Sequence, residues 1–276
     1  MTRPRRWYVV VSAFVTVIGL SPAADPPAAP TAAGDKWLTD RALTVTPAAE
    51  PRPALKYRLL PLASELKEGN AVPIYLRLAY EQRDETRKQL AETPQKWNEL
   101  PLDQVPLAEA HTFLDGVRHR YLMQFDYGAR RKSAEWEYTL EQPDPIGILL
   151  PDVQQMRQYA PMMVLRARVA VADGDYAEAA RAFSTGFAFS RHVGGGPFLI
   201  NGLVGIAVAN QLADRIPEWV ERPGAPNLYW SLTALPRRLI DLRTQMEFEQ
   251  RVVELQFPDL ADLNRPRTAG EWDAAL

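Results

Sequence analysis

Three residues with metal-binding side chains stand four positions apart. His111, Asp115 and His119 fall on one stripe of a predicted helix, because residues four positions apart share a helix face. Histidine and aspartate are common zinc ligands, so this spacing is compatible with a metal site. The two histidines, however, are separated by about 12 Å along a helix that rises 1.5 Å per residue, too far for both to bind one ion. A pair of Asp115 with either histidine would need further ligands from elsewhere, and the stripe flanks the solvent-exposed face. We predict neither a metal ion nor another cofactor.

A second combination of side chains is typical of sugar-cleaving enzymes. Glu135 and Glu137 alternate with Trp136 and Tyr138, and such enzymes use paired carboxylates next to aromatic rings. Positions i and i+2 do not face each other on a helix, so we interpret these glutamates as surface residues.

Other catalytic chemistries find little support. The chain has no cysteine, which excludes disulfides, thiolate metal sites and cysteine nucleophiles. It has no Gly-x-Ser-x-Gly motif for a serine nucleophile, and its three histidines leave few bases for a catalytic triad. Gly194, Gly195 and Gly196 could offer backbone donors to an anion, but the lysine and serine of a phosphate loop are missing, and we expect a turn between helices.

The N-terminus has the layout of a signal peptide. Three arginines precede the uncharged apolar run of residues 7–20, and small residues lead to Ala23. A membrane span needs about 20 apolar residues, which makes this run short. We predict cleavage near Ala23 and an exported protein, whether periplasmic, in the cell envelope or secreted. Retention of the segment as an anchor is the alternative.

The mature chain divides into a linker and a folded domain. Residues 24–54 are rich in proline and alanine, which predicts a disordered linker. Residues 55–276 are the expected domain. Without the leader, 29 basic and 34 acidic side chains give a formal charge of −5, and no concentrated basic face is available for nucleic acid.

Apolar periodicity in this domain predicts helices and no strand ladder. One helix should run from a cap at Asn70, through Pro73 in its first turn, to Leu90. We expect the others at residues 107–127, 153–172, 176–192, 198–220, 228–234 and 237–256. Before them, apolar and basic residues alternate from residue 55, so residues 55–62 should lie as a strap across a helical surface.

The uncharged stretch of residues 193–213 has two interpretations. Its apolar character is compatible with a membrane span, but Pro197, two asparagines and a glutamine interrupt it. We expect a central buried helix, in which Gly202, Gly205 and Ala209 permit close packing, and no membrane span after signal cleavage. At the C-terminus, Thr268 and Glu271 have capping-box spacing, and Trp272 and Leu276 lie four apart. These residues form either a short final helix or the truncated copy of a longer segment.

The turn Asp173-Gly174-Asp175, with the helix after it, resembles the second half of a tetratricopeptide repeat, through Tyr176, Ala179, Phe183 and Gly186. The preceding helix departs from the family, with Met163, Arg166 and Ala170 at positions that usually hold large aromatic or leucine side chains. No second copy follows at the expected spacing. The resemblance therefore implies antiparallel helix pairs more than a superhelical groove.

Four further segments, PALKYRLLP, GNAVP, GGPFLINGLVGIA and GAPNLYWSLTALPRRLIDL, are similar to a family of exported bacterial proteins without an assigned activity. This similarity implies a shared helical domain and carries over no catalytic residue.

The sequence thus predicts an all-α fold of antiparallel helix pairs, resembling a helical repeat, after an extended proline-rich segment. The predicted function is a non-catalytic protein-interaction or scaffold domain of the bacterial cell envelope, with a protein or peptide as partner. Its candidate binding surface comprises Tyr176, Phe187, Asn227, Tyr229 and Trp230, and the core between helices is the alternative place for them.

The alternative function is an envelope hydrolase or metal-dependent enzyme that uses acidic residues with His111 or His119. A deep pocket with two carboxylates and a histidine would favour this enzyme, whereas a shallow apolar groove along helices would favour the interaction domain.

Overall fold

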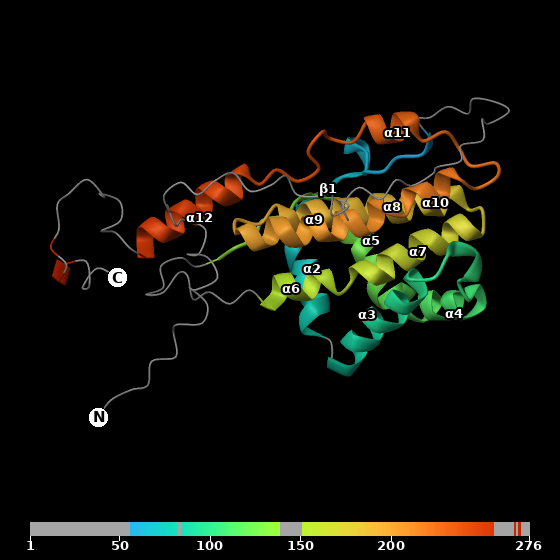
Figure 1. The fold of residues 1–276 in the computed structure, drawn as a ribbon, viewed down its shortest axis with the longest axis horizontal. Helices are drawn as coiled ribbons and strands as arrows, with labels where there is room; N and C mark the ends of the chain where they lie inside the picture. Colours follow the sequence, from blue (N-terminus) through green and yellow to red (C-terminus); the bar gives the residue numbers. More distant parts are fainter. Residues whose placement is uncertain (1–55, 82–83, 139–150, 257–267, 269, 272–276) are drawn as a thin grey trace, which may run out of the picture. The chain divides into compact units, whose positions relative to one another are not determined.

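The computed structural model describes residues 56–81, 84–138, 151–256, 268 and 270–271 (Figure 1). This part of the chain is mainly helical and has almost no strand, which confirms the all-α prediction. The predicted leader, the linker, Trp272 and Leu276 lie outside the described residues. Within those residues, no helix is both long and apolar enough for a membrane span.

Three helices form the centre of the domain: α7 (Ala160–Ala172), α8 (Tyr176–Gly194) and α9 (Leu199–Ala213). Helix α8 packs against both α7 and α9, and Figure 1 shows the three side by side. Phe183 on α8 is fully buried, and Ile206 on α9 is half-buried. The prediction of a central buried helix is therefore correct for the face of α9 that packs on α8, whereas Leu203 on α9 is 48% exposed.

Helix α7 is buried from its first residue to Val171, and so has no solvent-facing side. The turn that follows is the predicted one. Gly174 has a φ of +74°, a conformation that glycine adopts without a side-chain clash. Asp175 then caps α8 by accepting a hydrogen bond from the Glu178 backbone N–H at 3.0 Å.

The predicted helix from Asn70 to Leu90 is wrong in one respect, because the structure has two helices there. Helix α2 (Val72–Tyr80) packs on α5 (Met123–Ala129), whereas α3 (Asp84–Asn98) packs on α7. The two helices have different neighbours, and the propensities of the residues alone did not reveal this division.

The predicted helix at residues 107–127 also has a more complex form. Helix α4 (Leu107–Val117) continues through a π-helical turn, η5 (Arg118–Leu122), into α5. The predicted apolar face is largely buried despite this change of hydrogen-bond pattern. Such π-helical turns occur frequently at functional sites.

Two other predicted helices are interrupted, each close to a proline. The region 153–172 contains α6 (Pro151–Arg157) and α7, which has Pro161 in its first turn. The region 198–220 contains α9 and α10 (Ile216–Val220), with Pro217 in the first turn of α10. Proline lacks the backbone donor and clashes with the preceding turn, so it begins a new helix.

The C-terminal elements differ less from the prediction. Helix α11 (Tyr229–Thr233) matches its predicted range within one residue, and α12 (Arg243–Gln256) begins six residues later than expected. Thr268 and Glu271 form the predicted capping box through reciprocal backbone hydrogen bonds of 2.7 and 3.3 Å.

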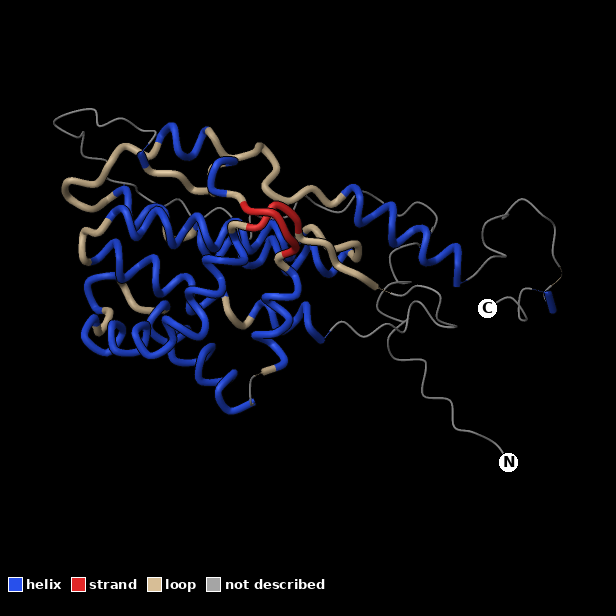
Figure 2. Tube along the Cα trace, turned by 180° about the vertical axis from the view of Figure 1, so that it is seen from behind, coloured by secondary structure: helices blue, strands red, loops and turns tan. Residues whose placement is uncertain are grey.

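One short sheet was not predicted. Strand β1 (Lys67–Asn70) pairs in parallel with β2 (Arg131–Ser133), drawn in red in Figure 2. The Asn70 side chain accepts hydrogen bonds from the backbone of Val72 and Glu135, which joins α2 to the segment after β2. Short 3-10 turns, η3 (Ala63–Glu65) and η4 (Leu102–Gln104), complete the described elements.

The strap has the predicted alternation in its described part. Tyr57 and Leu59 are buried, whereas Lys56 is exposed. The Tyr57 ring contacts Trp219 edge to face at 6.2 Å, and the Ser231 hydroxyl donates a hydrogen bond to the Tyr57 carbonyl. The strap therefore lies beside α11, as Figure 1 shows.

Candidate functional site

The candidate site is a pocket of about 360 Å³ between the α4–α5 segment, α7 and α8. Nine of its fourteen lining residues are ionisable: His111, Asp115, Arg118, Asp126, Arg166, Asp173, Asp175, Glu178 and Arg181. The π-helical turn contributes Arg118 and Leu122 to the wall. A charge density of this kind is unusual beside a buried helix such as α7.

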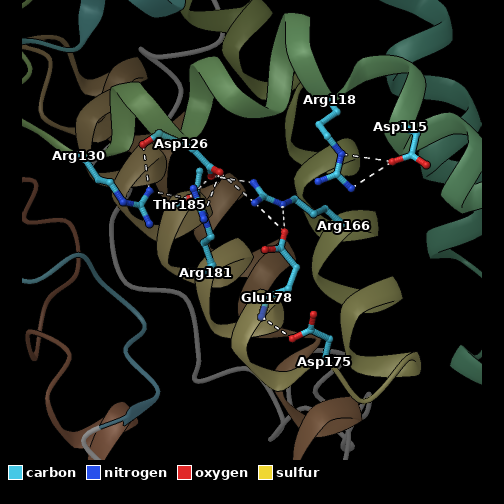
Figure 3. A network of polar contacts seen from close by, with 9 residues as sticks. All are labelled: Asp115, Arg118, Asp126, Arg130, Arg166, Asp175, Glu178, Arg181 and Thr185. Carbon is cyan, nitrogen blue, oxygen red and sulfur yellow. Dashed lines mark hydrogen bonds and ion pairs between the residues drawn. The ribbon is translucent and has the colours of Figure 1, made fainter. Parts of the chain in front are cut away.

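A bidentate ion pair forms the buried part of this cluster (Figure 3). The Arg166 guanidinium donates to both carboxylate oxygens of Asp126, at 2.8 and 3.0 Å. The Thr185 hydroxyl donates to Asp126 Oδ1 at 2.6 Å, and Arg181 Nε donates to Oδ2 at 3.2 Å. Both oxygens of Asp126 are therefore hydrogen-bonded twice.

The cluster extends from this pair in two directions. Arg166 Nε donates to Glu178 Oε1 at 2.7 Å, which links α7 to the first turn of α8. Arg130 Nη1 donates to the Asp126 backbone carbonyl at 3.0 Å, near the end of α5. The cluster thus connects α5, α7 and α8.

These contacts set the protonation states. Burial on its own would raise the pKa of Asp126, but the hydrogen bonds and charge of Arg166, with Thr185 and Arg181, outweigh burial and lower that pKa below its ordinary value. Contacts with Asp126 and Glu178 raise the pKa of Arg166 against the effect of its burial. Asp126 is therefore ionised at neutral pH and has no proton to transfer.

The three residues that were considered as metal ligands have different contacts. His111 Nε2 lies 3.1 Å from an oxygen of Asp173, and Asp115 accepts hydrogen bonds from Arg118 at 3.1 and 3.3 Å. His119 is exposed and lies outside the pocket lining. A search of the described residues finds no group of three histidine or acidic side chains with the geometry to hold a metal ion.

The glutamates of the second predicted combination point away from their aromatic neighbours. Glu135 and Glu137 are exposed, whereas the rings of Trp136 and Tyr138 stack at 6.2 Å on the other side of the segment. Trp136 Nε1 donates to the His192 carbonyl at 2.8 Å. The alternation belongs to an extended segment, so the two glutamates do not enclose a cleft with these rings.

The glycine loop before α9 is occupied by a side chain. Gln245 Nε2 donates to the carbonyls of Gly194 and Gly196, at 2.8 and 2.9 Å. Asn201 also packs directly against Gly196. The loop therefore forms the expected turn between α8 and α9, and Gln245 of α12 binds it.

The predicted binding surface divides between the core and the exterior. The Phe187 side chain is 2% exposed and stacks on Phe183, because α8 is covered by α7 and α9. Its assignment to an exposed surface is therefore corrected. Tyr176 is half-buried, stacks on Trp219 at 6.2 Å and donates to the Pro223 carbonyl at 3.3 Å.

The other three predicted residues form an exposed group at the start of α11. Tyr229 and Trp230 are 60% and 61% exposed, and their rings meet edge to face at 5.2 Å. The Asn227 side chain accepts a hydrogen bond from the Tyr229 backbone N–H at 2.9 Å. Ser231, on the buried side of α11, binds the strap. The aromatic pair is thus presented by an anchored helix.

An apolar groove of about 520 Å³ adjoins α9 and α12. Ile206, Ile240, Leu242 and Met246 line it together with four charged residues. The structure therefore contains both features that were meant to distinguish the two predicted functions, a pocket with carboxylates and a histidine, and a groove along helices.

The buried cluster was not predicted from the sequence, although one signal was present. Arg166 and Arg168 stand within the otherwise apolar run of α7, and a buried arginine needs partners. Arg168 also has an unexposed side chain and binds Glu218 at 2.7 Å and the carbonyls of Trp97 and Leu100 at 2.9 and 2.6 Å. These arginines indicate polar contacts across the core, but not which carboxylates take part.

Comparisons with protein-family models, curated proteins and solved structures found no match to this chain.

Proposed function

We propose that this protein is an exported, non-catalytic interaction or scaffold domain of the bacterial cell envelope, and that a protein or peptide partner docks on α11. The observation that carries the proposal is the exposed pair of Tyr229 and Trp230. The layout of residues 1–23 supports export, and the formal charge of −5 after cleavage argues against a nucleic-acid partner.

The aromatic pair has the properties of an interaction hot spot. Tyrosine and tryptophan offer a large apolar area with few rotatable bonds, and they are enriched among residues that contribute about 2 kcal/mol or more to binding. Asn227 and Ser231 hold α11 in place, so little conformational entropy is lost when a partner binds. The expected partner presents an apolar side chain to the angle between the two rings.

One observation favours the alternative enzyme, because the charged pocket brings His111 together with five carboxylates. The chemistry of the charged pocket, however, argues for a structural role. The pKa of Asp126 is lowered and both its oxygens are occupied, so it is a poor general acid or base. His111 Nε2 is already engaged by Asp173 at 3.1 Å.

Affinity capture from the native envelope with matched variants tests the proposal. The mature protein and the double variant Tyr229→Ala/Trp230→Ala are immobilised, with Tyr80→Ala as the control because Tyr80 is 67% exposed on a different helix. We expect a partner that the wild type and the control retain and the double variant loses. Equal retention by all three proteins would refute α11 as the docking site, and so would loss in both variants.

A His111→Ala variant separates the two candidate functions. The interaction domain should retain its partner in this variant, because His111 lies on α4 and pairs with Asp173, whereas the aromatic pair lies on α11. A hydrolytic activity of the mature protein that disappears in His111→Ala would establish the enzyme instead.

A further inference from the structure

A second cleft, of about 620 Å³, lies between α3, α6, α7 and α9 and plays no part in the proposed function. Half of its lining residues carry a primary carboxamide: Gln95, Asn98, Gln154, Gln158 and Gln211. The remaining polar wall consists of Arg157, Arg215 and Asp214, a formal charge of +1. The cleft is therefore nearly neutral, and rich in groups that both donate and accept hydrogen bonds.

One of these amides is deeply buried and incompletely bonded. The Asn98 side chain is 4% exposed, and its Nδ2 donates to the Pro161 carbonyl at 2.8 Å. This bond fixes the orientation of the amide. Within the described part of the chain, Asn98 Oδ1 accepts no hydrogen bond, although a buried acceptor without a partner is costly.

A donor without a partner lines the same cleft. Arg215 uses Nη1 to bind Glu218 at 3.0 Å and Nη2 to bind the Asn98 carbonyl at 2.8 Å. Among the described residues nothing accepts from its Nε, which is buried. Asn98 and Arg215 thus leave one acceptor and one donor unsatisfied in neighbouring positions.

We propose that this cleft binds an extended peptide main chain through hydrogen bonds that do not depend on its side chains. A primary carboxamide has the same donor and acceptor groups as a peptide bond, so one amide can pair with one peptide group through two hydrogen bonds. The amides come from helices on different sides of the cleft, namely α3, α6 and α9. They can therefore pair with successive peptide groups.

The lining disfavours other ligand classes. A sugar ring packs its apolar face on an aromatic side chain, and no aromatic residue lines this cleft. A phosphate-rich ligand requires concentrated positive charge, whereas the two arginines here are offset by Asp214, and Arg215 already binds Glu218. A neutral backbone can pair with the accessible amides of Gln95, Gln154 and Gln158 without introducing a charge.

Amide NMR with a defined probe tests the proposal. The full-length protein is labelled with ¹⁵N at asparagine and glutamine side chains and titrated to millimolar concentration with acetyl-Ser-Ala-Ser-Ala-Ser-amide. We expect the signals of Asn98, Gln154 and Gln211 to shift. The same peptide with N-methylated peptide bonds lacks backbone donors, and we expect it to bind about tenfold more weakly.

Variants show where the probe binds. Gln154→Ala/Gln211→Ala removes amides from two walls, and its affinity for the probe should fall about tenfold. Gln89→Ala is the matched control, because Gln89 is exposed on α3 and outside the cleft lining. Tyr229→Ala/Trp230→Ala should also bind the probe normally, so the test is independent of the function proposed for α11.

Several results would overturn the proposal. They are the absence of shifts at millimolar probe, equal binding of the N-methylated peptide, and equal loss of affinity in the Gln89→Ala control. Maltopentaose serves as a neutral glycan probe, and shifts at the cleft amides with this sugar but not with the peptide would assign the cleft to carbohydrate instead.

Discussion

The stability of the domain should fall as the pH is lowered from neutral, because of a single half-buried histidine, His192. His192 lies near the end of α8, where its Nδ1 is 2.9 Å from the hydroxyl of the fully buried Tyr75. Burial, and to a smaller extent the charge of Arg191, lowers the pKa of His192 to about 4. The imidazole is therefore neutral in the folded protein at physiological pH.

The sign of the effect follows from this lowered pKa. The unfolded chain takes up a proton on His192 near the ordinary value of about 6.5, whereas the folded protein does so only near pH 4. Between these values the unfolded state binds more protons, so stability decreases as the pH falls. Between pH 7.5 and pH 5.0, the free energy of unfolding should decrease by about 2 kcal/mol from this residue.

Urea denaturation followed by circular dichroism measures this difference, and pH 5.0 leaves most carboxylates ionised in both states. His192→Gln keeps a neutral polar group and should remove most of the pH dependence. His111→Gln is the matched control and should retain that dependence, because His111 is exposed. If stability rises toward pH 5.0, or if His192→Gln keeps the full pH dependence, the role assigned to His192 is refuted.

Three further substitutions test the packing by urea or thermal denaturation. Asp126→Ala leaves the buried guanidinium of Arg166 without its main partner and should cost about 3–5 kcal/mol, much of which Asp126→Leu/Arg166→Met should restore. Gly205→Ala places a Cβ 2.6 Å from a backbone carbonyl of α8 and should cost about 1–3 kcal/mol, whereas Gly116→Ala meets no neighbour and should be neutral or stabilising. Ser231→Ala should cost about 1 kcal/mol and accelerate hydrogen exchange in the strap, because it removes the hydrogen bond that holds the strap to α11.

The sequence predicted the helical elements better than their interruptions. Apolar periodicity identifies a buried face, and that face continues through the π-helical turn at residues 118–122 without a change of pattern. The breaks before α7 and α10 have a local cause in Pro161 and Pro217, so the sequence contained the information. The division between α2 and α3 depends on which neighbours these helices pack against, and the local sequence does not state this.

The same holds for the candidate sites: local sequence patterns predicted some residues, whereas residues that depend on distant parts of the chain were missed. Asn227, Tyr229 and Trp230 were predicted because proline, glycine and asparagine precede an aromatic pair, which is a local pattern of a loop that enters a helix. Asp126 was missed because its partner Arg166 lies 40 positions away in the chain. The burial of Phe187 likewise follows from the packing of α8 between two helices rather than from its sequence neighbours.

The two arginines of α7 explain how an almost uniformly apolar helix keeps one orientation. Because α7 is buried at nearly every position, apolar packing alone distinguishes poorly between its possible rotations. Arg166 and Arg168 are two positions apart, about 200° around the helix, so they reach partners on opposite sides. Arg166 binds α5 and α8, and Arg168 binds α10 and the carbonyls at the end of α3. A shift of α7 by one residue would turn both guanidinium groups by about 100° and leave them buried without partners, so the polar contacts specify the register that the apolar residues leave open.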